Sequence, residues 1–271
     1  DELLHHACVF NEGPMKGRIP VLFPAVGRSF DKGKLGCYRH RGTVYPMDIH
    51  GFAKDLPWRE TERHANADGA SVIVEVASTE QSLKSYPYPF LLSLQYILRE
   101  TCLTLTATIR NCGDEPMPFC FGYHPYFRAP LGEGRREGCI IHVPGDAVWE
   151  MSEGQPTGRK LPTPPEFAAG TPLPPEHLEK ILTDLEPDPD TGWACAEVCY
   201  PEAGKTLRVE FDPVGLGTVT VFSPPDSGYV CLEPRTGLPN ALSDEAPVKQ
   251  GVVRIGAGGS FRTTVRIRVL R

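Results

Sequence analysis

The sequence predicts an all-β protein, a sandwich or a similar antiparallel architecture built from many short strands. Apolar and polar residues alternate along most of the chain, and Gly, Pro, Asn or Asp bound most of the alternating segments. No long segment has a strong apolar stripe at helical spacing. Many strands without helices between them favour antiparallel sheets over an α/β fold.

The clearest strands are 92–98 and 103–109, which alternate strictly enough to predict a hairpin with one buried face. One short helix is expected at 175–185. The chain contains 28 prolines, which predict long rim loops, and 155–175 is the clearest of these loops. Further strands are expected at 71–77, 117–123, 139–143, 196–200, 206–211, 218–222, 229–232 and 262–269.

Composition narrows the classes of function. The 271 residues, 40% hydrophobic and 23% charged, fit a single soluble domain spanning 1–271. The net charge of −6 argues against a nucleic-acid partner, because phosphate-binding faces are normally basic. The sequence has no apolar run near the roughly 20 residues that a membrane helix needs, and no signal-peptide pattern. We therefore expect a protein that binds neither nucleic acid nor membrane, as a monomer or homodimer.

Cysteine and histidine usage indicates a reduced setting without a metal. The nine cysteines are scattered and form no C-x-x-C pair, so free and mostly buried thiols in the cytoplasm are expected. The eight histidines show neither H-x-x-x-H nor H-E-x-x-H spacing, which argues against zinc. The chain also lacks a G-x-S-x-G elbow and a P-loop, the usual signatures of serine hydrolysis and nucleotide phosphoryl transfer.

Three turns carry ionisable groups beside glycine or proline. The first contains His50 in the run His-Gly-Phe-Ala, the second contains His124 in Phe-Gly-Tyr-His-Pro-Tyr-Phe, and the third contains Glu233 in Tyr-Val-Cys-Leu-Glu-Pro. Histidine exchanges protons near neutrality, and a partly desolvated carboxylate has a raised pKa. If the three turns meet at one end of a sheet, they provide an acid and a base for concerted proton transfer. Each residue taken alone could equally be an ordinary turn or strand-end residue.

These residues resemble the aldose 1-epimerase, or galactose mutarotase-like, family. Four segments occur in the family's order: Ile-Pro-Val-Leu-Phe-Pro-Ala-Val-Gly-Arg at 19–28, His-Gly-Phe-Ala at 50–53 with Trp58, His-Pro-Tyr-Phe at 124–127, and Glu-Pro at 233–234. The resemblance implies a β-supersandwich with a concave sugar cleft. It also implies that no metal or organic cofactor takes part and that the partner is a small-molecule sugar.

The resemblance also implies roles. Glu233 would be the catalytic base that takes the proton of the anomeric hydroxyl, and His124 the acid that protonates the ring oxygen. His50 would orient the substrate, and Arg28 would hydrogen-bond its hydroxyls. Apolar faces would come from the rings of Phe52, Trp58, Tyr126 and Phe127.

Two departures from the family pattern concern the sugar. Galactose-type members continue the histidine motif as H-x-Y-F-N-L, whereas this chain reads H-P-Y-F-R-A, which places it among divergent relatives. The family's sugar-binding aspartate lies in an L-D-x-x-F setting. The nearest equivalent here is 178–184, where Glu179 or Asp184 would replace it.

The leading hypothesis is therefore an isomerase, an aldose 1-epimerase that acts on a hexose or a related aldose. A hexose-6-phosphate mutarotase is the first alternative, because Lys16 and Arg18 precede the Ile-Pro segment and could pair with a phosphate. A carbohydrate-binding protein without catalysis is the second, although pure binding would not need both His124 and Glu233. A polysaccharide lyase or hydrolase on a related fold is a remote fourth hypothesis.

Overall fold

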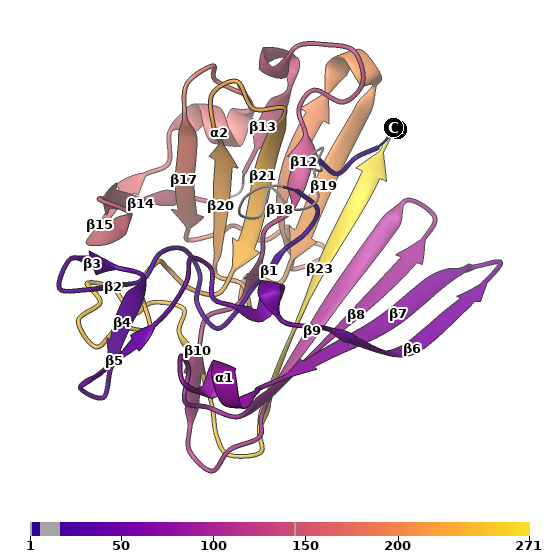
Figure 1. The fold of residues 1–271 in the computed structure, drawn as a ribbon. Helices are drawn as coiled ribbons and strands as arrows, with labels where there is room; N and C mark the ends of the chain where they lie inside the picture. Colours follow the sequence, from indigo (N-terminus) through magenta and orange to yellow (C-terminus); the bar gives the residue numbers. More distant parts are fainter. Residues whose placement is uncertain (1, 6–16, 144) are drawn as a thin grey trace.

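The computed structural model describes residues 2–5, 17–143 and 145–271, and it confirms the predicted antiparallel all-β fold. Two large sheets lie against each other and splay apart toward the tips of β6 to β9 (Figure 1). The eight-stranded sheet has the order β1 (Val21–Leu22), β11 (Gly122–Tyr123), β21 (Tyr229–Arg235), β20 (Thr218–Ser223), β17 (Leu178–Thr183), β14 (Ala147–Ser152) and β15 (Gln155–Pro162), with β12 (Tyr126–Arg128) also paired to β21.

The nine-stranded sheet has the order β16 (Thr171–Pro172), β13 (Ile140–His142), β18 (Ala194–Tyr200), β19 (Lys205–Phe211), β23 (Ser260–Leu270), β9 (Cys102–Asn111), β8 (Phe90–Arg99), β7 (Gly69–Ala77) and β6 (Arg59–Asn66). Three further pairs are β10 (Met117–Phe119) with β22 (Val253–Ile255), β2 (Phe30–Asp31) with β3 (Lys34–Leu35), and β4 (Cys37–His40) with β5 (Thr43–Pro46). The helices are short: η1 (Ala53–Asp55), α1 (Glu80–Leu83), η2 (Arg136–Gly138), α2 (Pro165–Ala169) and η3 (Pro201–Ala203).

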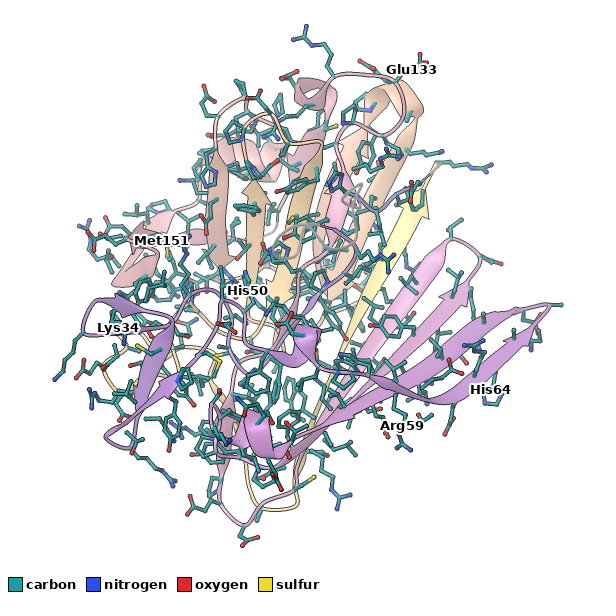
Figure 2. The ribbon with its side chains drawn as sticks, viewed as in Figure 1. Lys34, His50, Arg59, His64, Glu133 and Met151 are labelled. Carbon is teal, nitrogen blue, oxygen red and sulfur yellow. The ribbon has the colours of Figure 1, made fainter. Side chains whose placement is uncertain are left out.

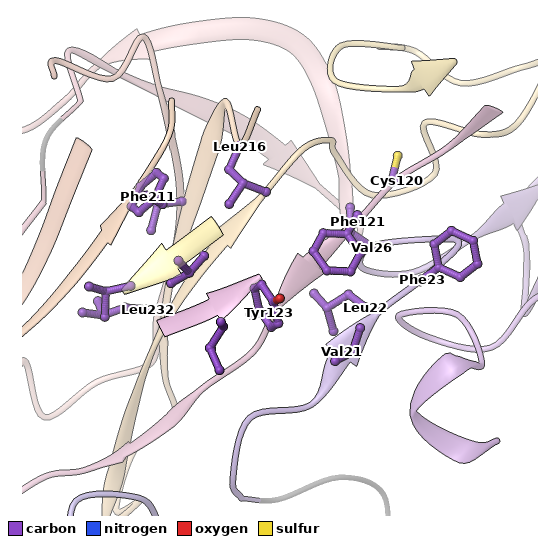
Figure 3. Packing of buried hydrophobic residues seen from close by; sticks show 14 of the residues in the cluster. Val21, Leu22, Phe23, Val26, Cys120, Phe121, Tyr123, Phe211, Leu216 and Leu232 are labelled. Atoms are coloured by element: carbon purple, nitrogen blue, oxygen red, sulfur yellow. The ribbon is translucent and has the colours of Figure 1, made fainter. Parts of the chain in front are cut away.

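One apolar core fills the space between the two sheets. Val230 and Leu232 of β21 belong to it, together with Leu92 of β8 and Ile267 of β23. Figure 3 shows part of this packing, with Leu232 among the labelled side chains. Because successive side chains of a strand point to opposite faces, Cys231, Glu233 and Arg235 share the face of β21 turned away from this core. The candidate site lies on that second face.

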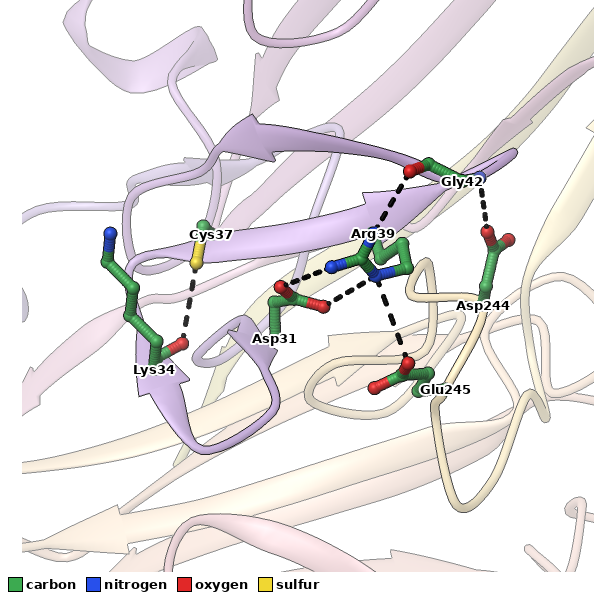
Figure 4. Close-up of polar contacts among 7 residues, drawn as sticks. All are labelled: Asp31, Lys34, Cys37, Arg39, Gly42, Asp244 and Glu245. Atoms are coloured by element: carbon green, nitrogen blue, oxygen red, sulfur yellow. Dashed lines mark hydrogen bonds and ion pairs between the residues drawn. The ribbon is translucent and has the colours of Figure 1, made fainter.

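The small hairpins are joined to the loop that follows β21. The Arg39 guanidinium of β4 donates two hydrogen bonds of 2.9 Å to Asp31 and lies 3.8 Å from Glu245 (Figure 4). The Gly42 N–H donates to Asp244 at 3.1 Å. The Phe30 N–H donates to the Asn240 side chain at 2.8 Å. These contacts hold the segment around Arg28 and the loop 236–250 together beside the site.

Several element predictions are wrong in detail. The segment 175–185 contains strand β17 rather than a helix. Its apolar positions 178, 181 and 182 fit helical spacing, but here they are buried on both faces of a central strand between β14 and β20. The expected loop 155–175 contains β15, α2 and β16. Strand β15 tolerates its prolines because it lies at the edge of its sheet.

Two strand boundaries also differ from the prediction. The segment 117–123 is divided into β10 and β11, and β21 continues past Glu233 to Arg235. Glu233 therefore lies inside a strand rather than at its end. The eight cysteines that the structure describes are unpaired, and four of them are buried. Within the described part of the chain, none of the helices has the length and apolar character needed to cross a bilayer.

Candidate active site

The register of three strands brings His124 and Glu233 together. Strand β11 pairs Gly122 with Arg235, and β12 pairs Tyr126 with Cys231. Counting inward from either pair along the antiparallel strands places His124 opposite Glu233. Pro125 has no N–H to donate to a ladder, which accounts for the interruption between β11 and β12. Although 109 residues separate His124 from Glu233 in the sequence, the two side chains therefore form a direct cross-strand pair.

The two side chains touch in a desolvated environment. His124 Nε2 lies 3.2 Å from Glu233 Oε1, and the two residues are 4% and 2% exposed. Burial raises the pKa of Glu233 to about 8, with nearby Arg235 opposing the shift. Burial also lowers the pKa of His124 to about 3, and the positive charge of Arg235 acts in the same direction. Between these pKa values the pair holds a single proton, which lies on Glu233, and the direct contact allows the proton to be shared with His124. An acid and a base that hold one proton between them can exchange protons with one substrate.

His50 joins this pair from the turn before η1. Its ring meets the His124 ring edge-on with 5.2 Å between centroids, and Figure 2 shows His50 near the middle of the molecule. The Gly27 N–H donates to His50 Nδ1 at 3.0 Å, so Nε2 carries the ring proton. Burial lowers the pKa of His50 well below its usual value, helped by His124 and Arg235. His50 is therefore a neutral hydrogen-bond donor.

The backbone around His50 leaves little freedom. His50 has a φ of 65°, and its carbonyl accepts from the Phe23 N–H at 3.3 Å. Gly51 has a φ of 71°, and a Cβ there would lie 2.2 Å from the Phe23 carbonyl oxygen. Only glycine fits this close approach, which explains the second residue of the His-Gly-Phe-Ala motif.

Aromatic rings pack against His124 and connect it to the solvent-exposed edge of the site. Tyr126 stacks on the imidazole at 4.5 Å with an interplanar angle of 10°. On the other side Phe222 of β20 meets His124 edge-on at 6.2 Å and His177 at 5.6 Å. His177 Nε2 lies 3.4 Å from Glu179, and both side chains are about half exposed. The pair Glu179 and His177 therefore marks the solvent side of the site.

A buried arginine completes the charged groups. Arg235 is 3% exposed, and its Nη1 lies 3.8 Å from Glu233 Oε2. Gly122 makes room for it, because a Cβ at Gly122 would lie 2.6 Å from the Arg235 Cβ. The charge of Glu179 raises the pKa of Glu233 and of Arg235, which places that carboxylate within electrostatic range of both.

The structure thus brings together His124, Glu233 and His50, as the convergence of the three turns predicts, and it adds Tyr126 and Glu179 to them. Arg28 is exposed and follows Gly27, whose N–H contacts His50, so Arg28 lies at the rim of the site. Asp184 is engaged by Lys160 at 2.6 Å at the end of β17. Glu179, rather than Asp184, is therefore the acidic side chain that faces the pair.

Three predicted aromatic contacts lie elsewhere. Phe52 packs near Tyr86 and Phe90, with centroids 6.5 and 6.3 Å away. The Trp58 Nε1–H donates to the Ala53 carbonyl at 2.9 Å and so braces the turn that carries His50. Phe127 is fully buried in the core. These rings support the site rather than line it. They are close to the site residues in the sequence, but their side chains pack on other faces.

Sequence reasoning missed Arg235, Phe222 and His177. Arg235 follows Glu-Pro directly, so the alternation of β21 would have placed it beside Glu233 had the strand been extended past the proline. Phe222 and His177 lie on or next to strands β20 and β17. Their approach to His124 depends on strand order in the sheet, which no local pattern contains.

The fold and the site together define an antiparallel β-sandwich protein with a buried histidine–glutamate pair on one sheet face. The chain belongs to the aldose 1-epimerase family, whose model matches residues 10–267. It is 28% identical over 88 residues to the "Putative glucose-6-phosphate 1-epimerase" of Escherichia coli K12, covering 32% of this chain and 26% of that protein. It is 26% identical over 196 residues to the protein YphB of the same organism, covering 69% of this chain and 62% of YphB. This chain thus matches less than two thirds of the length of either relative.

Solved structures confirm the fold. A galactose mutarotase-like protein from Clostridium acetobutylicum superposes with a TM-score of 0.81 at 23% identity, over 93% of this chain and 79% of that chain. The Slr1438 protein from Synechocystis superposes with a TM-score of 0.78 at 24% identity, over 95% and 80%. The β-supersandwich expected from the sequence motifs is therefore the fold of this chain.

Proposed function

We propose that this chain is an aldose 1-epimerase that interconverts the α and β anomers of a hexose or a related aldose. The observation that carries the proposal is the buried contact of 3.2 Å between His124 Nε2 and Glu233 Oε1. Anomer exchange needs a base at the anomeric hydroxyl and an acid at the ring oxygen. Both oxygens are bonded to one carbon, so the acid and the base must themselves be close neighbours.

In the proposed reaction the single proton of the pair first passes from Glu233 to His124 across their 3.2 Å contact, which leaves Glu233 as a carboxylate and His124 as an imidazolium. Glu233 takes the proton of the anomeric hydroxyl while His124 protonates the ring oxygen, and the bond between the anomeric carbon and the ring oxygen breaks. The products are an open-chain aldehyde and a pair that still holds one proton, now on Glu233. Rotation of the aldehyde and reversal of both transfers give the other anomer. Each positioned proton transfer contributes roughly 10²–10⁴-fold.

Surrounding residues suit an uncharged, hydroxyl-rich substrate. The neutral His50 donates from Nε2, and Glu179 accepts from sugar hydroxyls at the solvent side. Arg28 at the rim and Arg235 beside Glu233 are donors. The positive charge of Arg235 and the negative charge of Glu179 offset each other, so the site as a whole favours a neutral ring.

A sugar 6-phosphate is the second candidate substrate, supported by the name of one relative and by the position of Arg18. Arg18 lines a cleft of about 280 Å³ with Lys54 and Trp58, and its carbonyl accepts from the Tyr126 N–H at 2.9 Å. A phosphate at that cleft would be near the backbone of Tyr126, the residue whose ring stacks on His124. Lys16, the other cation of this hypothesis, lies outside the described residues.

Polarimetry of freshly dissolved α-glucose, α-galactose and their 6-phosphates tests the proposal. We expect the purified chain to accelerate the approach to equilibrium rotation for at least one of them. A neutral sugar as the best substrate supports the first candidate, and a 6-phosphate supports the second. Sugar binding by calorimetry without any acceleration would contradict the enzyme assignment and indicate a carbohydrate-binding protein.

A further inference from the structure

Two buried arginines in this protein have opposite environments. The Arg136 guanidinium donates to the carbonyls of Pro174 and Pro224 and to the Ser227 hydroxyl, at 2.8 to 3.3 Å. Such a saturated arginine joins loops together and is structural. Arg235 differs, because its Nε is buried without a partner and its Nη1 remains 3.8 Å from Glu233, beyond hydrogen-bond distance.

Glu233 shows the complementary pattern. Its Oε1 faces His124 at 3.2 Å, whereas its Oε2 is buried, lacks a hydrogen-bond partner and is the oxygen nearest to Arg235. Both residues point to the same face of β21, two positions apart, and Gly122 leaves the space that Arg235 occupies. An unpartnered acceptor beside an unpartnered donor is a pattern that a sugar hydroxyl, which is both donor and acceptor, would complete.

We propose that Arg235 is a positioning residue of the acid–base pair: its charge draws Glu233 Oε2 to one side, so that Oε1 faces His124, and favours the carboxylate form that abstracts the proton. This inference rests on the proposed function. Burying a guanidinium without hydrogen bonds is unfavourable for the fold. A nearby carboxyl group that must become an anion in an apolar surrounding during the proposed reaction explains its presence there.

The groups that interact with Glu233 or Arg235 determine the expected direction of the pH effect. They are Cys231 and Arg235 on β21, Glu179 on β17, His124 between β11 and β12, Tyr126 on β12, His50 before η1 and Cys120 before β11. Among these, Arg235 is the fixed positive charge, and it lowers the pKa of both His124 and Glu233. Removing it should shift both limbs of the pH–rate profile to higher pH, since a charge at this range changes a pKa by roughly 1–3 pH units.

The test compares kcat profiles of the wild type with Arg235→Met, Arg235→Gln and Arg235→Lys, and uses Arg136→Lys as the matched control. We expect the limbs of the pH–rate profile to move to higher pH by about 1 pH unit or more in the two neutral variants, Arg235→Met and Arg235→Gln. Arg235→Lys should restore the wild-type limbs at reduced kcat. Arg136→Lys should lose stability and keep the wild-type limbs. Neutral variants with unshifted limbs, or an equal shift in Arg136→Lys, would overturn the proposal.

A second measurement needs neither turnover nor a stable neutral variant. The guanidinium resonances of Arg235 should titrate together with Glu233 in nuclear magnetic resonance spectra of the wild type, and should not titrate in Glu233→Gln. Resonances that stay constant across the pH range of Glu233 would overturn the positioning role even if the chain is a mutarotase. Conversely, a titrating Arg235 in a chain that accelerates no sugar would refute the proposed function and leave the electrostatic coupling established.

Discussion

Replacing Glu233 with glutamine should change the pH dependence of stability as well as activity. In the folded protein, burial raises the pKa of Glu233 from 4.5 to about 8. In the unfolded chain the carboxyl ionises near its ordinary value. The stability contributed by the protonated carboxyl is therefore fully present below pH 4.5 and is lost progressively as the pH rises to 8. Glutamine cannot ionise, so the stability of the variant should not fall with rising pH for this reason.

The magnitude follows from linkage. Between the two pKa values, each pH unit lowers the free energy of unfolding of the wild type by about 1.4 kcal/mol. From pH 5 to pH 7.5 the unfolding free energy of Glu233→Gln should therefore rise by about 3 kcal/mol relative to the wild type. Any constant effect of the amide on packing cancels in this difference. Urea denaturation at several pH values measures it directly.

The control is Glu133→Gln, because Glu133 is an exposed glutamate far from the site (Figure 2). Its unfolding free energy should follow that of the wild type across the range. Parallel curves for Glu233→Gln and the wild type would refute the reasoning, since they would show that Glu233 titrates like an exposed carboxyl. At pH 7 the same variant should lose at least about 10²-fold in turnover with little change in apparent affinity, because glutamine keeps the shape but cannot accept the proton.

Three further substitutions test other parts of the site. His124→Ala removes the acid and should lower turnover by roughly 10²–10⁴-fold in the polarimetric assay; a wild-type rate would remove His124 from the mechanism. Gly122→Ala places a Cβ 2.6 Å from the Arg235 Cβ, so it should lower the free energy of unfolding by about 1–3 kcal/mol and reduce turnover, whereas Gly256→Ala, which meets nothing within 4 Å, should do neither. The double variant Lys16→Glu/Arg18→Glu should keep its activity on a free hexose; a selective loss on the 6-phosphate, with that sugar also the better wild-type substrate, would favour the second candidate.

Strand alternation was sufficient to predict the fold class and about half of the strands. The hairpin of β8 and β9 and strands β18, β19 and β23 follow it closely, since buried and more exposed positions alternate along much of their length. It failed at β17, where burial on both faces gives a spacing that also fits a helix. It failed again at β21, where a proline suggested a strand end although the neighbouring strands continue the sheet through Arg235.

The site was predictable to the extent that it lies in short motifs. His50, His124 and Glu233 each stand beside glycine or proline, and these local signals located them. Their contact depends on the shared register of β11 and β12 on β21, which is a property of the assembled sheet. Arg235 and Phe222 have no local signal apart from alternation, and Phe52 and Trp58 lie in the motif but pack against other faces.

The exchange rate between α and β anomers at equilibrium, measured by magnetisation exchange between their anomeric protons, tests most directly whether the His124–Glu233 pair performs the reaction. With a substrate aldose, we expect the wild type to produce exchange cross-peaks that grow with enzyme concentration. Glu233→Gln and His124→Ala, at the same concentration and with sugar still bound, should reduce the exchange to near the uncatalysed rate. Undiminished exchange in either folded variant would contradict catalysis by this pair.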